Sequence, residues 1–358
     1  MGTLRTLLAI SVVITHSYGY FFVGGQNAVQ LFYIISGFLI SYALTQQKTY
    51  STYSRFYISR ILRLYPIYLV VATLTLVAYY FSALYVKKPE FFSVWNNIPT
   101  DAGILLIFSN LFLFAQDWIM FLGIRDNQLV FLTDFLKSDI LLFRGLLIPQ
   151  AWTLGVELTF YLIAPFVLHH RWRIYCLLVC SLGIRGCLIY LGIGWDDPWT
   201  YRFFPAELAL FLIGALAHQI LLPMYNRLPE RRLKLYGQYA TIVLVFIVVI
   251  FFKIPIPELY RTLVLFVIFV IALPLLFIFS NYYDLDRAIG DLSYPVYICH
   301  ILVLMVVMAG SNHFAWLTKG YIAICCVIFS LVFAYILNHF VGGVCERYRS
   351  RFKNNIVT

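Results

Sequence analysis

The stretch "RTLLAISVVITH" at residues 5–16 begins with Arg5, ends with His16 and has ten uncharged, mostly apolar residues between them. Similar runs recur along the whole chain of 358 residues, which is 62% hydrophobic and only 12% charged, with a mean hydropathy of +0.85. Soluble domains are about 45–50% apolar and about 25% charged. The composition therefore excludes a soluble enzyme and predicts an integral membrane protein with spans of about 20 residues.

Ten apolar runs have the length of a membrane span, so we expect an all-α integral membrane protein with about ten transmembrane helices. They lie at 6–23, 28–45, 64–86, 151–168, 174–192, 203–222, 236–252, 260–280, 294–310 and 320–342. The region 101–150 is apolar but interrupted by charges, and we expect a hairpin or re-entrant region there. Residues 1–358 show no internal repeat and no separate soluble domain, which predicts a single membrane-embedded domain.

Basic residues orient the chain, because Lys and Arg collect in cytoplasmic loops. With the N-terminus inside and 87–150 outside, most of the 26 Lys and Arg residues fall on the inner side, so we expect both termini to be cytoplasmic. The net charge of +10 is then a topology signal rather than a mark of nucleic-acid binding. The seven Cys residues form no CxxC pair and have no His at metal-ligand spacing, so no metal is expected.

Arg5 and His16 share a helix face, because eleven residues make about three turns, or about 16.5 Å along the axis. An ionisable group at membrane depth is costly and usually faces the bundle interior or a water-filled cavity. His16 is therefore either a structural histidine bonded to a neighbouring helix or a base that works near neutral pH.

Five further segments follow in order: "GGQNAVQLFYIISGFLIS" (24–41), "SRFYISRILRLYPIYL" (54–69), "AWTLGVELTFYLIAP" (151–165), "YRFFPAELALFLIGAL" (201–216) and "DLSYPVYICHILV" (291–303). Together with Arg5 and His16 they resemble the membrane-bound acyltransferase 3 family, from residue 4 to about 345. Two departures are visible. The acidic residue usual before the first-span Arg is absent, and the usual Trp-Ser-Leu is Trp152-Thr153-Leu154.

The resemblance implies a membrane-bound O-acyltransferase of the plasma (bacterial inner) membrane. Such enzymes transfer an acyl group, usually acetyl from cytoplasmic acetyl-CoA, to a hydroxyl of a cell-envelope or exported glycan such as lipopolysaccharide. The expected partners are acyl-CoA, a glycan or lipid-linked sugar acceptor and the lipid bilayer, with no metal.

The predicted site residues divide into three groups. The catalytic group is His16, Arg5 and Glu157, in which His16 either deprotonates the acceptor or carries the acyl group. Arg60 and Arg63, with Arg5, are expected to bind the phosphates of the cofactor, although topology anchoring alone also explains such arginines. The acceptor-binding group is Trp152, Glu157, Arg202 and Glu207, for which the alternative is an interfacial aromatic belt with Glu–Arg pairing.

The main alternative function is a transporter or flippase for a lipid-linked glycan, without acyl transfer. Ten spans and buried charge suit a transporter, but transporters often show repeated halves, and none is visible here. Within the predicted spans, Ser36 is expected to be a helix contact, and the depth and partner of His300 are open.

Overall fold

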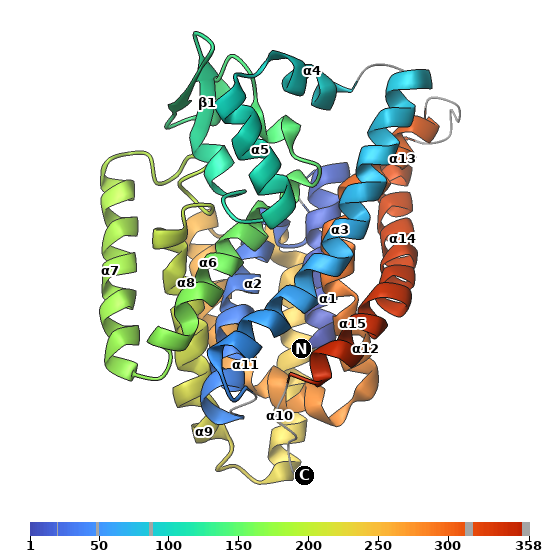
Figure 1. The fold of residues 1–358 in the computed structure, drawn as a ribbon. Helices are drawn as coiled ribbons and strands as arrows, with labels where there is room; N and C mark the ends of the chain where they lie inside the picture. The colour runs from blue at the N-terminus through green and yellow to red at the C-terminus, as the bar shows by residue number, and fades with distance from the viewer. Residues whose placement is uncertain (20, 48–49, 86–88, 312–317, 353–358) are drawn as a thin grey trace. The chain divides into compact units, whose positions relative to one another are not determined.

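The computed structural model describes residues 1–19, 21–47, 50–85, 89–311 and 318–352. Figure 1 shows the described chain as a ribbon. By their contacts, these residues divide into two compact units. Unit 1 comprises Met1–Ile67, Ala164–Ile174 and Leu210–Thr358, and unit 2 comprises Tyr68–Ile163 and Tyr175–Ala209. Four residues of the charge count that orients the chain lie outside the described residues: Lys48, Lys87, Lys88 and Lys353.

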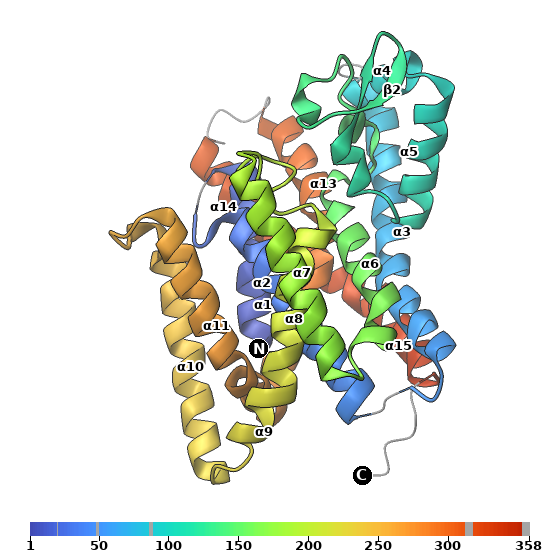
Figure 2. The same ribbon diagram turned by 90° about the vertical axis from the view of Figure 1, so that its left-hand side faces the viewer.

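Unit 1 is helical over its described residues, with α1 (Gly2–Ser17) as its inner helix. α1 packs against α2 (Gly24–Ser41), α12 (Asp284–Asp291), α13 (Ser293–Ser311) and α14 (Lys319–Leu337). α10 (Glu230–Ile250) and α11 (Glu258–Tyr282) form an antiparallel pair (Figure 2). Unit 1 also holds α9 (Leu222–Tyr225), α15 (Gly343–Ser350) and parts of α3 (Tyr53–Tyr85), α6 (Trp152–Val167), α7 (Arg171–Tyr190) and α8 (Phe204–Leu216).

Glycines allow α2 and the last turns of α8 to approach to backbone contact. A Cβ on Gly37 would lie 1.9 Å from the carbonyl oxygen of Phe211, and one on Gly214 would lie 2.0 Å from that of Ile34. No side chain fits at such separations. The "SGF" segment is thus a close-packing surface, and the buried Ser36 lies beside it, where small residues let helices pack closely.

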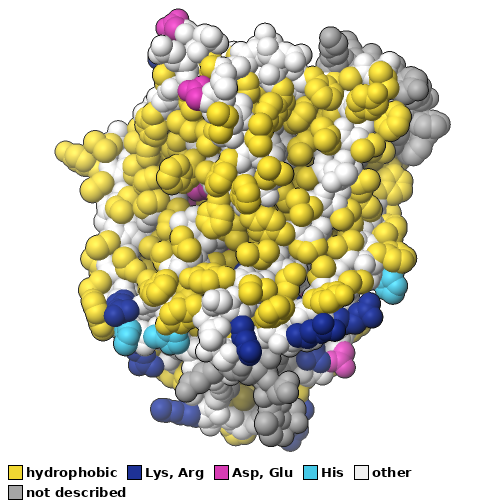
Figure 3. All heavy atoms as spheres, in the orientation of Figure 1, with side chains coloured by type: hydrophobic (Ala, Val, Ile, Leu, Met, Phe, Trp, Pro, Cys, Tyr) yellow, Lys and Arg dark blue, Asp and Glu magenta, His cyan; other side chains and the backbone are white. Residues whose placement is uncertain are grey.

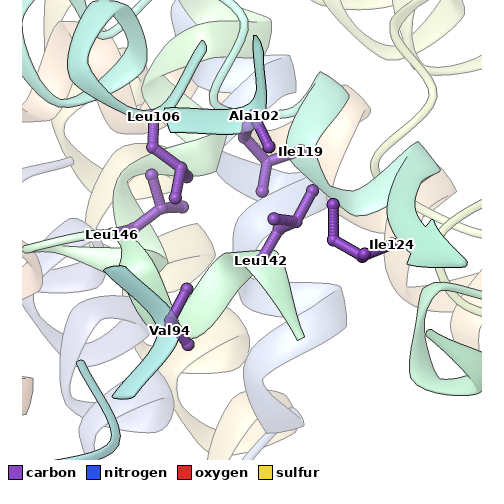
Figure 4. Packing of buried hydrophobic residues seen from close by; sticks show 7 residues of the cluster. All are labelled: Val94, Ala102, Leu106, Ile119, Ile124, Leu142 and Leu146. Carbon is purple, nitrogen blue, oxygen red and sulfur yellow. The ribbon is translucent and has the colours of Figure 1, made fainter. Parts of the chain in front are cut away.

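Unit 2 contains α4 (Glu90–Asn97), α5 (Thr100–Phe112) and an antiparallel hairpin of β1 (Leu122–Arg125) and β2 (Gln128–Phe131). The turn residues Asp126 and Asn127 both have positive φ, 48° and 59°, as a two-residue hairpin turn requires. A hydrophobic cluster joins these elements (Figure 4): Val94, Ala102, Leu106, Ile119, Ile124, Leu142 and Leu146. The region 101–150 therefore folds as one helix, a small sheet and short turns around an apolar core, and its re-entrant character stays a prediction.

Eight helical stretches among the described residues are long and apolar enough to cross a membrane. They are Gly24–Gln46, Tyr53–Leu84, Arg171–Tyr190, Phe204–Tyr225, Glu230–Lys253, Glu258–Tyr282, Asp284–Ser311 and Lys319–Ser350. The predicted spans 6–23 and 151–168 form α1 and α6, which have 16 residues each. Such a helix is about 24 Å long, short of a hydrocarbon core of about 30 Å. The all-α membrane class is confirmed, and the count of about ten stays a prediction.

The surface of unit 1 changes character along its last helices. Hydrophobic side chains cover α14, whereas Lys and Arg side chains gather over α15 (Figure 3). An apolar surface bounded by basic residues is typical of a membrane helix that ends at an interface.

Candidate active site

The start of α1 is fixed by Asp286 of α12. Its carboxylate accepts hydrogen bonds from the backbone N–H groups of Gly2 and Thr3, each at 2.8 Å, and from the Thr3 hydroxyl at 2.7 Å. A carboxylate there satisfies backbone donors that have no partner within the helix and opposes the positive end of the helix dipole. An acidic group is therefore present at the start of α1, although it comes from α12 and not from the residues before Arg5.

α1 carries Arg5 and His16 three turns apart, as the spacing predicts. Arg5 is half-buried in the second turn. His16 lies in the last turn and is exposed, because the helix ends at Ser17 and the chain turns into α2 at Gly24. The predicted span 6–23 is therefore not one continuous helix. It includes the turn after Ser17, which leaves His16 accessible.

Arg5 lines a cavity of about 510 Å³ within unit 1. Two further guanidinium groups line it, from Arg63 of α3 and Arg349 of α15, together with the carboxylates of Asp291 and Glu346. Glu346 forms a 2.5 Å ion pair with Arg349. Other lining residues are Leu39, Leu62, Pro66, Ile67, Tyr294, Pro295, Asn338, Gly342, Gly343 and Cys345. Three arginines from three segments distant in sequence therefore converge on one space, opposed by two acids.

Arg349 was not among the predicted site residues, because the basic residues after the last span carry no motif that separates a ligand-binding arginine from a topology signal. Only the fold brings α15 back to the start of α1.

Arg60 does not line this cavity, although it lies one turn from Arg63. It is buried, its guanidinium lies over the rings of Tyr50 and Phe56, and it donates a 2.5 Å hydrogen bond to the Tyr50 hydroxyl. Burial alone would raise the pKa of Tyr50, but the charge of Arg60 and the hydrogen bonds from Ser59 and Arg60 outweigh it and lower that pKa. Arg60 therefore holds Tyr50 against the start of α3. The predicted pair is divided, because Arg60 packs on aromatic rings whereas Arg63 lines the cavity.

His16 lies against a second imidazole. The ring of His300, from α13, has its centroid 5.2 Å from that of His16, with the planes tilted by 35°. His300 is 1% exposed, so the pair has one accessible and one buried member. The sequence did not predict this partner of His300, because an apolar run does not show which helix packs beside it.

In unit 2, Arg202 covers the predicted acceptor residue Trp152. The Arg202 guanidinium carbon lies 4.2 Å from the Trp152 ring centroid, and its nitrogens bind both carboxylate oxygens of Asp197 at 2.5 and 2.8 Å. Trp152 is only 6% exposed. These contacts favour the structural alternative for both residues, because the aromatic face that a sugar ring needs is occupied by a cation.

Glu207 is fully buried and pairs with Arg185 of α7. Glu157 is half-buried on α6 and accepts a short hydrogen bond from the Tyr161 hydroxyl. The structure therefore brings Trp152 and Arg202 together and gives Glu207 a partner that sequence spacing did not suggest.

Asp117 is a buried carboxylate that the sequence analysis treated only as an interruption of an apolar segment. Its Oδ1 has no hydrogen-bond partner among the described residues, and a Cβ on Gly155 of α6 would lie 2.5 Å from that oxygen. Burial raises the pKa of Asp117 to about 7, against the opposing effect of the backbone N–H groups of Asp117 and Trp118. The segment with Trp152 and Glu157 thus packs directly on a carboxyl group.

The described residues form a helical membrane protein with an arginine-lined cavity and an exposed histidine in the last turn of α1. The chain belongs to the acyltransferase 3 family, whose model, described as an acyltransferase domain, matches residues 2–339. It is therefore an acyltransferase.

An uncharacterized protein of Aquifex aeolicus (strain VF5) is 26% identical over 213 residues, which is 58% of this chain and 90% of that relative. No solved structure matches. Among the described residues, no three His, Cys, Asp or Glu side chains are grouped as a metal site would need.

Proposed function

We propose that the protein transfers an acetyl group from acetyl-CoA to a hydroxyl of a cell-envelope glycan. The observation that carries this proposal is the cavity of unit 1, where Arg5, Arg63 and Arg349 converge at the foot of the helix that carries His16. Like charges repel, so three guanidinium groups that line one cavity favour an anionic ligand. The diphosphate and 3′-phosphate of CoA are such a ligand, and Arg binds phosphate with planar, two-pronged contacts.

The position of Arg5 and His16 on one rigid helix suits a long substrate. With the phosphates near Arg5, the pantetheine arm can run along α1 toward His16, about 16.5 Å away. A thioester reaches the exposed imidazole in this way without any movement of the helix. CoA, whose acyl group is far from its phosphates, fits this separation.

His16 is proposed to act as the base. It takes the proton from the acceptor hydroxyl as the oxygen attacks the thioester carbonyl carbon. The new C–O bond forms, the C–S bond breaks, and the proton passes to the thiolate of CoA. Because His16 lies in the last turn of α1, the negative end of the helix dipole stabilises the imidazolium that forms. Transfer through an acyl group on His16 itself is the second version of the same step.

For the acceptor side, we propose that Glu157 contacts sugar hydroxyls, since its carboxylate is half-buried and accepts from a neighbouring tyrosine hydroxyl. The Glu157 carboxylate can accept a hydrogen bond from a sugar hydroxyl in place of the Tyr161 hydroxyl. Arg202 and Glu207, each held in an ion pair, are proposed to support the fold around it.

We propose that the cavity opens toward the cytoplasm of a bacterial inner membrane, with both termini on that side. The gathering of Lys and Arg over α15 beside the cavity supports this orientation (Figure 3). Acetyl-CoA would then reach Arg349 directly from the compartment where it is made. Labelling of a cysteine placed at Glu230, at the start of α10, tests the orientation: reagents confined to the outside should leave it unmodified.

The decisive test of the function is reconstitution. The purified protein in lipid vesicles should move a labelled acetyl group from acetyl-CoA to an envelope glycan, and glycans from cells that lack the gene should lack that group by mass analysis. Movement of an unmodified lipid-linked glycan across the vesicle membrane, without acetyl transfer, would support a flippase instead.

A further inference from the structure

The buried imidazole of His300 is the feature of unit 1 that the transfer reaction does not yet use. Its Nδ1 lies 2.7 Å from the backbone carbonyl oxygen of Tyr297. A carbonyl oxygen can only accept a hydrogen bond, so Nδ1 carries the hydrogen, and in the neutral ring the lone pair is on Nε2. The backbone of α13 therefore fixes the tautomer of His300.

Nε2 of His300 has no hydrogen-bond partner among the residues that the structure describes, although the ring is 1% exposed. A buried polar atom left in this way is costly, on the order of 1–3 kcal/mol. The ring of His16 lies against that of His300, with the two centroids 5.2 Å apart. Two imidazoles joined by an N–H···N hydrogen bond of about 2.9 Å have their centroids about 5 Å apart. The observed separation matches that value, so a rotation of the His16 ring would bring its N–H to Nε2 of His300.

We propose that His300 is a positioning residue for His16. Its Nε2 accepts a hydrogen bond from one ring N–H of His16, which places the lone pair of His16 on the opposite, exposed nitrogen. The bond that one ring nitrogen of a histidine makes decides which nitrogen is basic, and a base held by a third group is the usual arrangement in nucleophile activation. The inference rests on the proposed function of His16 as base or acyl carrier.

Helix packing allows this role, because α1 and α13 are direct neighbours within unit 1. α13 contributes an anchored acceptor, and α1 contributes an exposed ring in its last turn. The accessible imidazole can meet substrate while the buried one stays fixed.

Three substitutions separate the two nitrogens of His300. His300→Gln keeps an amide oxygen close to the position of Nε2, so it retains the acceptor. His300→Asn keeps an amide N–H close to Nδ1 and loses the acceptor. His300→Phe keeps only the ring shape. If His300 is purely structural, the variant closest to wild type in His16 labelling and acetyl transfer should be Phe, which keeps the ring shape, or Asn, which keeps the hydrogen bond to the Tyr297 carbonyl. If His300 positions His16, the Gln variant should be the closest to wild type in both measurements, because it alone keeps the acceptor.

The first readout does not depend on acyl transfer. Diethyl pyrocarbonate acylates the unprotonated nitrogen of an accessible imidazole, and mass spectrometry gives the rate at each histidine. We expect the rate at His16 to fall about 2- to 10-fold in the Asn and Phe variants, which is the range of one hydrogen bond, and to stay near the wild-type rate in the Gln variant. His339, an exposed histidine of the same unit, is the internal control and should react at one rate in all proteins.

The second readout is the kinetics of acetyl transfer. The Asn and Phe variants should lower kcat about 10- to 100-fold, a part of the 10²–10⁴-fold that a general base contributes, and leave KM for acetyl-CoA unchanged. An unchanged rate at His16 in all three variants, or a Phe variant as active as Gln, would overturn the inference. Failure of the proposed function is a different outcome: no acetyl transfer by the wild type, with the His16 labelling pattern intact.

Discussion

The two units hold their charges in different ways. In unit 2, Arg202 and Asp197 form one ion pair and Arg185 and Glu207 another, so each of these four charges is balanced by a side chain close in space. In unit 1, guanidinium groups from α1, α3 and α15 meet at one cavity. A buried charge that is already paired needs no ligand, whereas guanidinium groups that converge on one cavity repel one another and favour an anionic ligand. The contrast is the reason for which we propose donor binding in unit 1 and a supporting role for the ion pairs of unit 2.

The largest expected effect concerns His16. His16→Asn retains a polar side chain that can hydrogen bond but cannot take a proton near neutral pH. We expect the protein to reach the membrane in normal amount and acetyl transfer to fall about 10²–10⁴-fold. Quantifying membrane protein and acetylated glycan in the same cells checks this, and transfer within a few-fold of wild type would show that His16 only packs.

The ion pair of unit 2 should affect stability rather than chemistry. Glu207→Leu leaves Arg185 without its carboxylate partner and should lower the free energy of unfolding by about 3–5 kcal/mol. The double variant Arg185→Met with Glu207→Leu removes both charges and should recover most of that loss. Thermal unfolding in detergent measures both proteins. A double variant that is stable but unable to acetylate would contradict the contrast between the units.

Asp117 makes the stability of unit 2 depend on pH. Its pKa in the folded protein is about 7, above the usual 3.8, so the folded state favours the protonated form. The contribution of Asp117 to stability is therefore most favourable below about pH 4 and is lost as the pH rises toward 7. Asp117→Asn should remove this loss and stabilise the protein at pH 8 by up to about 4 kcal/mol. The melting temperatures of the wild type and the Asp117→Asn variant should differ more at pH 8 than at pH 5. An equal difference at both pH values would show that Asp117 is ionised throughout this range.

Arg60 and Arg63 sharpen the comparison within one helix. Arg60→Gln should lower the free energy of unfolding by about 1.5–3 kcal/mol through the lost bond to Tyr50, and leave the affinity for acetyl-CoA unchanged. Arg63→Gln should weaken the affinity for acetyl-CoA and leave the free energy of unfolding unchanged. Melting curves and donor affinities of the two variants decide it, and equal effects on affinity would place both arginines at the phosphates.

Sequence patterns predict the helical membrane class and the shared face of Arg5 and His16, because both follow from local periodicity. Arg63 lines the cavity of unit 1, and its role in binding the donor stays a prediction. Sequence patterns miss Arg349 and the Arg185–Glu207 pair and leave the partner of His300 open, because each depends on which helices become neighbours. They overextend the first span, since apolar residues 18–23 look continuous although the helix ends at Ser17.

Direct binding of acetyl-CoA tests the central claim, that the cavity of unit 1 holds the acyl donor. The matched variants are Arg349→Gln, in the cavity, and Arg347→Gln, on the same turn of α15 but exposed and outside the cavity lining. Loss of one charge-assisted contact is about 1.5–3 kcal/mol, or roughly 10- to 150-fold in Kd. We predict this loss for Arg349→Gln and wild-type affinity for Arg347→Gln. Equal affinity of the two variants would contradict the assignment of the cavity to CoA.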